Sequence, residues 1–569
     1  MIAERLRDLS REDIDLLTSQ LERWACERPD RQALTLLGDG ELATCSVTFA
    51  DLYRAALSIA GALSAAGAAG RPVLILSRSQ IDFAAAFFGC LYAGAIAVPC
   101  NSVGPRTRAW QRVAAIVADA VPAAALGTAE TVDLLAAVEA LGVPALLPDS
   151  SNICQTHSGP QSPDAPALLQ YTSGSTGSPK GVVITHRNLA SNLQMLTSSL
   201  GVHDQSAYLT WLPLFHDMGL VGNLLAAIYR GVRCILMPPV SFYQRPQRWL
   251  SAISRYGATI SGAPNFGYEF CVRNFGRMNV SGLDLSRWET AFCGAELVRP
   301  STMRRFAELF AGAGFRASAL YPCYGLAEAT VFVCGGERNG GIKTALNESG
   351  AAVVSCGRAT AGERLVIVDS ESHKPLPDGR VGEIWVAGDH VANGYWNKPA
   401  LTEATFMARL CTADTHFYLR TGDLGWMRDG ELYFAGRLKD VIVCRGLSIN
   451  PEDIEMTAAQ CHSAFGEMNA VFSVEIRDEE RVVVVQELRP ITPPAFDSAA
   501  ALTTLLEGVA NAHGIHLYDA VLVQSGAVPR TTSGKVQRKR CRELYCHGDL
   551  GHAVRAAVRS PIPPLPRIL

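Results

Sequence analysis

The chain has 569 residues, which is more than a single compact core usually holds, so two or more domains are expected. With 48% hydrophobic and 18% charged residues, its composition is typical of a globular protein and excludes a largely disordered chain. The formal net charge of −3 excludes a broadly basic surface for nucleic acid or an anionic membrane, so any recognition of phosphate must be local.

The N-terminal residues carry both charge signs and no apolar core, which argues against a secretory signal peptide. The cysteines include no CxxC pair, so we expect free thiols and a cytoplasmic location rather than a zinc ribbon or thioredoxin motif. Residues 83–105 carry no charge and are numerous enough to cross a bilayer, but Gly94 and Pro99 divide them. We therefore predict a buried helix followed by a buried strand, and no membrane span.

Strand and helix patterns alternate through the first two-thirds of the chain. Apolar segments with these patterns predict strands at 73–76 and 96–98 and helices at 81–92 and 110–118. The alternation is typical of an α/β fold, in which parallel sheets are flanked by helices.

Two smaller units are expected in the last third of the chain. Residues 364–386 have the pattern of a β-hairpin with a Pro-Asp-Gly turn, which predicts a small β subdomain at about 355–435. Short helix and strand patterns restart after it and predict a small α+β domain. We therefore expect a large N-terminal domain at 1–435 and a small mobile C-terminal domain at 436–569.

The strongest local signal is YTSGSTGSPKG at residues 171–181, between two apolar segments. Small residues let the backbone approach phosphate oxygens, and their N–H and hydroxyl groups donate hydrogen bonds. The loop is not a Walker A motif, because its lysine has neither the preceding glycine nor the following Ser or Thr. A plain linker between strands explains the terminal Lys-Gly pair less well. The predicted nucleotide contacts are Thr172, Ser173, Gly174, Ser175, Thr176, Gly177 and Lys180.

This loop resembles the phosphate loop of the adenylate-forming superfamily, which includes acyl-CoA synthetases, adenylation domains of peptide synthetases and luciferases. More motifs that resemble those of the superfamily follow in the expected order: YGLAEA at 324–329, YLRTGDLG at 418–425, GRLKD at 436–440 and PRTTSGKV at 529–536. Taken singly, their charged residues could be turn or surface residues. Their joint occurrence favours a nucleotide site.

The resemblance implies a role for each motif. Tyr324 would stack on adenine, and Glu328 would be catalytic and lie near Mg²⁺. Asp423 would accept hydrogen bonds from the ribose hydroxyls, Lys439 would be the hinge between the domains, and Lys535 would be the catalytic lysine. A cation is needed there because a carboxylate that attacks a phosphate meets another anion. The other implied nucleotide contacts are Gly294, Ala295, Glu296, Gly325, Leu326, Ala327 and Arg437.

Within the superfamily, the chain resembles the fatty acyl-AMP ligases from about residue 21 to residue 544. WLPLFHDMGL at 211–220 is the most distinctive segment, and its His216 would lie near the acyl carboxylate and act in catalysis. A helix start capped by Asp217 is a compatible structural interpretation. We expect apolar residues of 211–220, 261–268 and 323–326 to line the acyl chain.

The resemblance implies a reaction in two steps, with ATP and Mg²⁺ as cofactors. A fatty acid and ATP give acyl-adenylate and pyrophosphate, and the acyl group then passes to the phosphopantetheine thiol of an acyl carrier protein. The carrier would be a separate protein, for example one of a polyketide or nonribosomal peptide synthase. Rotation of the C-terminal domain would separate the two steps.

Two alternatives stay open at this point. The segment that restricts CoA use in fatty acyl-AMP ligases corresponds to residues 335–353, which are few for that role, so a fatty acyl-CoA ligase is the first alternative. A non-catalytic homologue that binds acyl or nucleotide ligands is the second, although Lys180, Glu328, Asp423 and Lys535 are all present. A domain that activates amino acids is less favoured, because no pocket aspartate for the α-amino group is evident.

Overall fold

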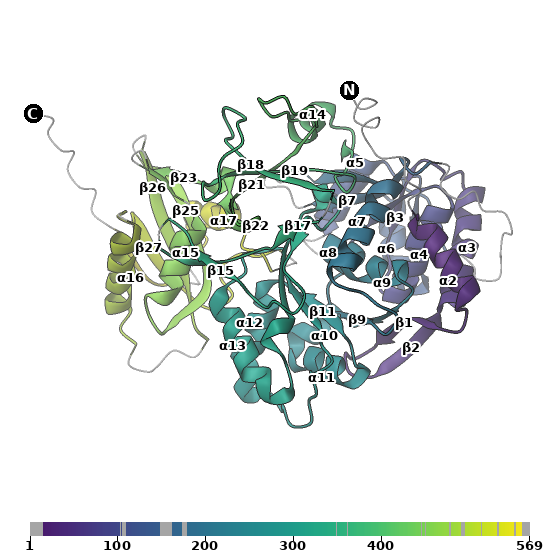
Figure 1. Cartoon of the computed structure of the whole chain (residues 1–569), viewed down its shortest axis with the longest axis horizontal. Coiled ribbons are helices and arrows are strands. Elements are labelled where there is room, and N and C mark those ends of the chain that lie inside the picture. Colours follow the sequence, from purple (N-terminus) through teal and green to yellow (C-terminus); the bar gives the residue numbers. More distant parts are fainter. Residues whose placement is uncertain are drawn as a thin grey trace, which may run out of the picture.

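The computed structural model describes residues 15–102, 104, 110–147, 162–172, 179–348, 350–360, 362–444, 447–449, 451–476, 479–490, 496–513, 515–531, 534–550 and 554–559. Figure 1 shows two large sheets flanked by helices, a smaller β region, and a separate group of C-terminal elements at one side. The expected α/β class is confirmed.

The first large sheet has seven strands in the order β20-β8-β7-β4-β3-β5-β6. The strands β4, β3, β5, β6 and β7 run parallel, whereas β8 and β20 add antiparallel pairs at one edge. The bounds are β3 (Pro72–Ile75), β4 (Ile96–Pro99), β5 (Ala124–Leu126), β6 (Ala145–Leu146), β7 (Pro166–Thr172), β8 (Lys180–Thr185) and β20 (Gly394–Tyr395).

The second large sheet has nine strands in the order β17-β14-β13-β12-β11-β9-β10-β1-β2. Its central strands β13 to β1 are parallel, and antiparallel strands close both edges. The bounds are β1 (Gln32–Leu37), β2 (Ala43–Thr48), β9 (Ala207–Thr210), β10 (Arg233–Leu236), β11 (Ile260–Ala263), β12 (Thr290–Cys293), β13 (Leu320–Tyr324), β14 (Cys334–Gly335) and β17 (Arg358–Ala359).

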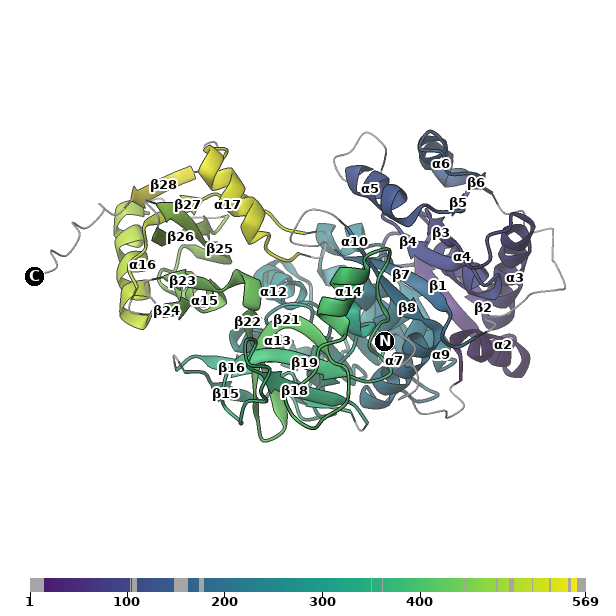
Figure 2. The same cartoon turned by 90° about the horizontal axis from the view of Figure 1, so that it is seen from above.

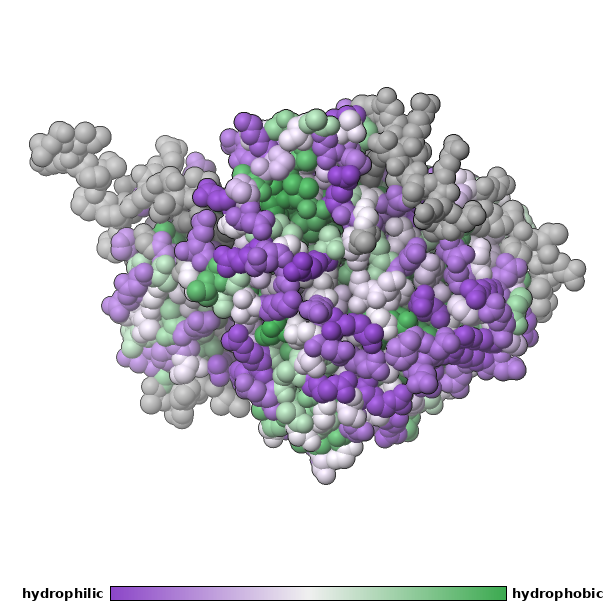
Figure 3. All heavy atoms as spheres, viewed as in Figure 1, coloured by the Kyte–Doolittle hydropathy of each residue, from purple (hydrophilic) through white to green (hydrophobic). Residues whose placement is uncertain are grey.

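The uncharged stretch after residue 83 forms a buried helix and a buried strand in this α/β region. Helix α4 (Gln80–Tyr92) buries every residue from Phe83 to Tyr92, and β4 follows it as a buried strand. No helix in the described part of the chain is long and apolar enough to cross a bilayer. Each cysteine with a described side chain is a free thiol. On the face of the molecule that Figure 3 shows, hydrophilic residues predominate.

Other helices cover the two large sheets or join their strands. They are α2 (Leu17–Glu27), α3 (Phe49–Ala65), α5 (Trp110–Ala120), α6 (Val132–Glu139), α7 (His186–Ser199), α8 (Asp217–Gly219), α9 (Ala226–Tyr229), α10 (Pro239–Gln244), α11 (Gln247–Tyr256), α12 (Asn265–Asn274) and α13 (Pro300–Phe310), with a π-helical turn, η2 (Leu220–Leu225). Local sequence sets the start of α3, where Thr48 and Asp51 form a reciprocal capping box.

The predicted hairpin is present in the small β region. Strand β18 (Arg364–Val368) pairs antiparallel with β19 (Gly382–Ala387), and β21 (Leu419–Arg428) and β22 (Glu431–Arg437) complete a four-stranded sheet. A separate hairpin joins β15 (Thr344–Leu346) and β16 (Ala352–Val354), and α14 (Pro399–Phe406) lies between β20 and β21 in the chain.

The C-terminal elements form a unit with its own core. Its sheet has the order β25-β26-β27-β28, with a two-stranded ladder of β23 and β24 and three helices. In the described part of the chain, no buried apolar cluster combines residues before 436 with residues after it. The predicted division at 435 and 436 stays a prediction, which this separation favours. The bounds are β23 (Ile442–Cys444), β24 (Leu447–Ile449), α15 (Pro451–Gln460), β25 (Phe465–Ile476), β26 (Glu479–Leu488), α16 (Ser498–His513), β27 (Asp519–Val523), α17 (Arg538–His547) and β28 (Val554–Arg559).

Figures 1 and 2 both place these C-terminal elements beside β22 and α12. The region between them and the two large sheets therefore contains residues that are far apart in the chain.

Candidate active site

A cavity of about 1100 Å³ lies where the large sheets, the small β region and the C-terminal elements meet. Its wall includes the carboxyl ends of β7, β12 and β13, the edge at which open α/β sheets usually bind ligands. Every predicted site residue within the described ranges borders it: Thr172, Lys180, His216, Gly294, Ala295, Glu296, Tyr324, Gly325, Leu326, Ala327, Glu328, Asp423, Arg437, Lys439 and Lys535. Ser173, Gly174, Ser175, Thr176 and Gly177 lie outside the described residues.

The base of the phosphate loop is fixed by side chains from other elements. Thr172 and Lys180 are register partners at the ends of β7 and β8, so the two ends of the loop lie side by side. The Tyr171 hydroxyl donates to Asp119 over 2.7 Å, and the Lys398 ammonium donates to the same carboxylate. The backbone that enters the loop is therefore held before any ligand binds.

Lys180 and Glu328 both contact Tyr395. The Lys180 Nζ atom lies 5.2 Å from the centre of the Tyr395 ring, and the Tyr395 hydroxyl donates to Glu328 Oε1 over 2.9 Å. Sequence reasoning missed Tyr395, because it belongs to the two-residue strand β20, which has no periodic pattern of its own. The contact fixes the carboxylate that the sequence predicts as the metal ligand.

Asp423, in the middle of β21, contacts the last residues of β13 and β22. Its Oδ2 atom accepts a 2.8 Å hydrogen bond from the Tyr324 hydroxyl, and its Oδ1 atom lies 3.2 Å from Arg437 Nε. Its side chain is buried, and the charge of Asp423 raises the pKa of Arg437. A carboxylate has several lone pairs, so Asp423 can still accept hydrogen bonds from a diol while it holds these partners.

Two unusual backbone positions shape the cavity wall where the chain leaves β12 and β13. A Cβ atom on Gly325 would lie 1.7 Å from the Val331 carbonyl oxygen, so only glycine fits there. Ala295 has a φ of 67°, in the left-handed region that disfavours a side chain. Such strained residues gather at functional sites because the surrounding structure must hold them.

Lys535 enters the cavity from the C-terminal side. Burial, and then the charge of Arg437, lower the pKa of the Lys535 ammonium. Three carboxylates oppose this shift, those of Asp217, Asp423 and Glu296. Burial also raises the pKa of Glu296 to about 7. Several acids in the cavity wall therefore balance the charge of Lys535.

His216 and Asp217 stand at the start of the short helix α8. Burial lowers the pKa of His216, so its imidazole is neutral at pH 7. The expected cap by Asp217 is wrong: His216 occupies the cap position without a side-chain capping bond. The Asp217 carboxylate instead accepts from the Met218 N–H over 2.7 Å, and its negative charge raises the pKa of Lys535.

Lys439 lies on the cavity wall in the 3₁₀ turn η7 (Leu438–Asp440). Burial and the charge of Arg437 lower the pKa of Lys439, and Lys180 lowers it further. The predicted hinge is therefore close to the phosphate loop.

One side of the cavity is apolar, and it differs in part from the expected acyl lining. Met218, Cys323 and Leu326 border the cavity as predicted, but no residue of 261–268 does. Trp211 packs instead in a buried aromatic cluster, stacked on Phe242 with ring centres 3.8 Å apart. Further apolar residues in the lining include Leu196, Leu200, Gly222, Phe292, Val298, Val331 and Phe332.

Within the described ranges, no group of three or more His, Cys, Asp or Glu side chains could hold a metal ion alone. Glu328 nevertheless offers a carboxylate, the type of ligand that Mg²⁺ takes together with water and substrate phosphates. The residues present therefore fit a cation that arrives with a nucleotide.

Comparison with known proteins gives matches over nearly the whole chain. Residues 21–396 match the family described as AMP-binding enzyme, and residues 439–554 match the AMP domain of Disco-interacting protein 2-like proteins. The chain is 36% identical over 574 residues to the medium-chain-fatty-acid–[acyl-carrier-protein] ligase JamA of Moorena producens, covering 95% of this chain and 97% of JamA.

Two further relatives agree with these matches. The chain is 42% identical over 404 residues to the medium-chain-fatty-acid–[acyl-carrier-protein] ligase TtuA of Teredinibacter turnerae, covering 67% of this chain and 63% of TtuA. A crystal structure of the fatty acyl-adenylate ligase of Legionella pneumophila, in complex with acyl adenylate and pyrophosphate, superposes with a TM-score of 0.71. That protein is 35% identical, and the match covers 97% of this chain and 99% of the other.

Proposed function

The chain belongs to the AMP-binding enzyme family, as one of its fatty acyl-AMP ligases, and we propose that it activates a fatty acid with ATP and passes the acyl group to an acyl carrier protein. The observation that carries this proposal is one cavity that combines Lys535, Glu328 and Asp423 with an apolar side. The polar part suits a nucleotide, and the apolar part suits an alkyl chain.

In the first step the fatty acid carboxylate attacks the α-phosphorus of ATP, and the bond to pyrophosphate breaks. Lys535 neutralises the negative charge shared by the carboxylate and phosphate oxygens. Neutral His216 orients the carboxylate by a hydrogen bond, and Asp423 accepts hydrogen bonds from the ribose hydroxyls. Lys180 and the loop that it ends hold the leaving phosphates.

Mg²⁺, bound by Glu328 and phosphate oxygens, would supply further charge neutralisation at the phosphates. Tyr395 would hold the Glu328 carboxylate in place for this purpose, through the hydrogen bond described above.

In the second step a pantetheine thiol attacks the acyl carbonyl, and AMP leaves. Lys535 lies in the cavity in this structure, so the thiol needs a different pose of the C-terminal domain. Rotation about Lys439 would supply it. A Lys439→Pro substitution should spare acyl-adenylate formation and slow acyl transfer, and equal losses in both steps would count against the hinge.

The acceptor would be the carrier protein of a polyketide or nonribosomal peptide synthase, in the cytoplasm. The names of two relatives, JamA and TtuA, specify an acyl carrier protein as acceptor. They favour a carrier protein over free CoA as the acceptor here.

The test is a single-turnover measurement with ATP, dodecanoic acid and either CoA or a holo acyl carrier protein. Acyl-adenylate that persists with CoA but transfers to the carrier protein is the expected result. Rapid acyl-CoA formation would make the chain a CoA ligase. Absence of pyrophosphate release from the wild-type protein would refute adenylation altogether.

A further inference from the structure

Helix α12 contacts the C-terminal elements at both of its ends. At its N-terminal end, a Cβ atom on Gly534 would lie only 2.6 Å from Phe266 Cδ1, so the loop that carries Lys535 lies directly against the Phe266 ring. The Phe266 N–H donates to Glu296 over 2.5 Å, on the cavity wall. The start of α12 therefore contacts both the Lys535 loop and Glu296, a residue of the cavity wall.

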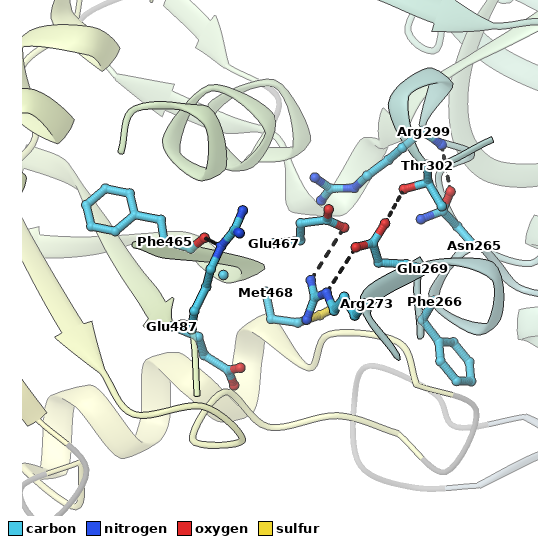
Figure 4. A network of polar contacts seen from close by, with 12 residues as sticks. Asn265, Phe266, Glu269, Arg273, Arg299, Thr302, Phe465, Glu467, Met468 and Glu487 are labelled. Atoms are coloured by element: carbon cyan, nitrogen blue, oxygen red, sulfur yellow. Dashed lines mark hydrogen bonds and ion pairs between the residues drawn. The ribbon is translucent and has the colours of Figure 1, made fainter. Parts of the chain in front are cut away.

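A charged cluster forms the second contact, about two turns further along α12 at Arg273 (Figure 4). The Arg273 guanidinium lies 3.0 Å from Glu269 Oε1 on the same helix and 3.5 Å from Glu467 Oε2 on β25. Glu269 is 3% exposed, and its other oxygen accepts from the Thr302 hydroxyl over 2.9 Å. Arg273 and Glu269 are thus held by contacts within the part of the chain before residue 436, and Glu467 is their partner from the C-terminal unit.

A bulge in β25 presents Glu467 to this cluster. Phe465 pairs with Leu488 and Asn469 with Gln486, so two more residues separate the pairs on β25 than on β26. The buried Gln486 amide fills the bulge and donates to the Gly466 carbonyl over 2.6 Å. Because bulges redirect side chains and interrupt pairing, this one accounts for the position of Glu467 outside the sheet.

We propose that Arg273 and Glu467 are positioning residues that dock the C-terminal unit on α12 and so deliver Lys535 to the cavity for acyl-adenylate formation. This proposal rests on the proposed function. Neither side chain borders the cavity, so both act through the pose of the Lys535 loop and not on the substrate. The acyl-transfer step uses another pose and does not need the contact.

The strength of this contact depends on the charges in the cluster. Burial, and then the facing Glu269, raise the pKa of Glu467 to about 7, whereas Arg273 and Arg299 oppose this shift. Arg273 therefore bridges Glu467 and Glu269 across the interface, and Arg299 adds a second positive charge that acts on Glu467. Removal of Arg273 leaves two facing acids without their nearer cation, which weakens docking more than the loss of an ordinary surface charge.

The test compares the two half-reactions in Arg273→Ala, Glu467→Ala and the control Arg277→Ala. The control removes the same charge from an exposed position four residues further along. Acyl-adenylate formation is measured by pyrophosphate release with ATP and dodecanoic acid. Transfer is measured from preformed acyl-adenylate to a holo acyl carrier protein. We expect Arg273→Ala and Glu467→Ala to slow adenylate formation about threefold to tenfold, with transfer and the control unchanged.

Exchanging the two charges distinguishes a loss of docking from a loss of folding. Arg273→Glu should slow adenylate formation more than Arg273→Ala, because three acids then face one another, and adding Glu467→Arg should restore most of the rate. Equal losses in both half-reactions, losses no larger than in the control, or no rescue by the exchange would overturn the docking role. A wild-type protein without adenylate formation would instead refute the proposed function.

Discussion

Gly222 offers a direct test of where the acyl chain lies. It is buried in the π-helical turn η2 and borders the cavity, yet a Cβ atom there would have only Met218 Cγ as a neighbour, at 4.0 Å. The Gly222 backbone therefore faces empty space. By contrast, a Cβ atom on Gly219, one turn earlier, would lie 2.3 Å from the Pro213 carbonyl oxygen.

A larger side chain at Gly222 should shorten the accepted fatty acid. Leucine places about four carbon atoms in the space that the end of an alkyl chain would fill, and each methylene buried there contributes about 0.8 kcal/mol. Gly222→Leu should therefore cost about 3 kcal/mol on a chain that reaches this point, or roughly a hundredfold in kcat/KM. Gly222→Ala adds one carbon and should cost correspondingly less.

The assay is pyrophosphate release with saturated acids of increasing length, for wild type, Gly222→Ala, Gly222→Val and Gly222→Leu. The preferred length should fall in step with the size of the side chain, and the loss should grow with substrate length. A uniform loss for all lengths would show a packing defect. An unchanged length profile would show that the chain runs elsewhere, and would refute the assignment of this apolar wall.

Three further predictions concern the polar side of the cavity. Lys535→Ala should lower the rate of acyl-adenylate formation at least about a hundredfold, because it removes a cation from the developing charge, but transfer from preformed acyl-adenylate should survive; parallel loss of both steps would contradict its role. Tyr395→Phe removes the hydrogen bond to Glu328 and should raise the Mg²⁺ concentration needed for half-maximal adenylate formation about threefold to tenfold, and an unchanged Mg²⁺ titration would argue against Glu328 as a ligand. Burial raises the pKa of Glu296 to about 7, so the folded state favours the protonated carboxyl. The stability that this protonated form contributes is complete below the unfolded-state pKa and is lost as pH rises through 7. Glu296→Gln should therefore raise the thermal unfolding midpoint at pH 8 and leave it nearly unchanged at pH 5, and an equal shift at both pH values would contradict this ionisation.

Local patterns predicted the secondary structure well where an element carries its own periodicity. The helix expected at 81–92 is α4, and the strand pattern at 364–386 is the β18–β19 hairpin. The sequence could not show that β20, with two residues, pairs with β8 more than two hundred residues earlier. Such a strand exists only because the sheet edge offers unpaired backbone groups, and that edge forms only in the folded chain.

The same limit applies to the site. Residues inside motifs could be proposed from the sequence because their types and spacing are local features, and those in the described ranges border one cavity. Their roles stay predictions. Tyr395 and Arg273 lie outside these motifs, and only tertiary structure brings them to Glu328 and Glu467. The sequence likewise could not show that the charge of Asp217 raises the pKa of Lys535, which is more than three hundred residues away in the chain.

The composition of the contact between the two units bears on how the enzyme would complete both steps. Within the described ranges, each buried apolar cluster lies wholly before or wholly after residue 436. Contacts between the two units include the polar pairs Arg273 to Glu467 and Asn347 to Asp453. The Phe266 ring also packs against Gly534. Separation of a buried apolar interface exposes its whole surface to water, whereas polar groups that separate can exchange their partners for water at a smaller net cost. A lysine that must leave before a thiol arrives needs the second kind of contact. The bulge that presents Glu467 and the preformed partner on α12 would then serve to make the weak pose specific, because geometry and charge select one docking position without making it permanent.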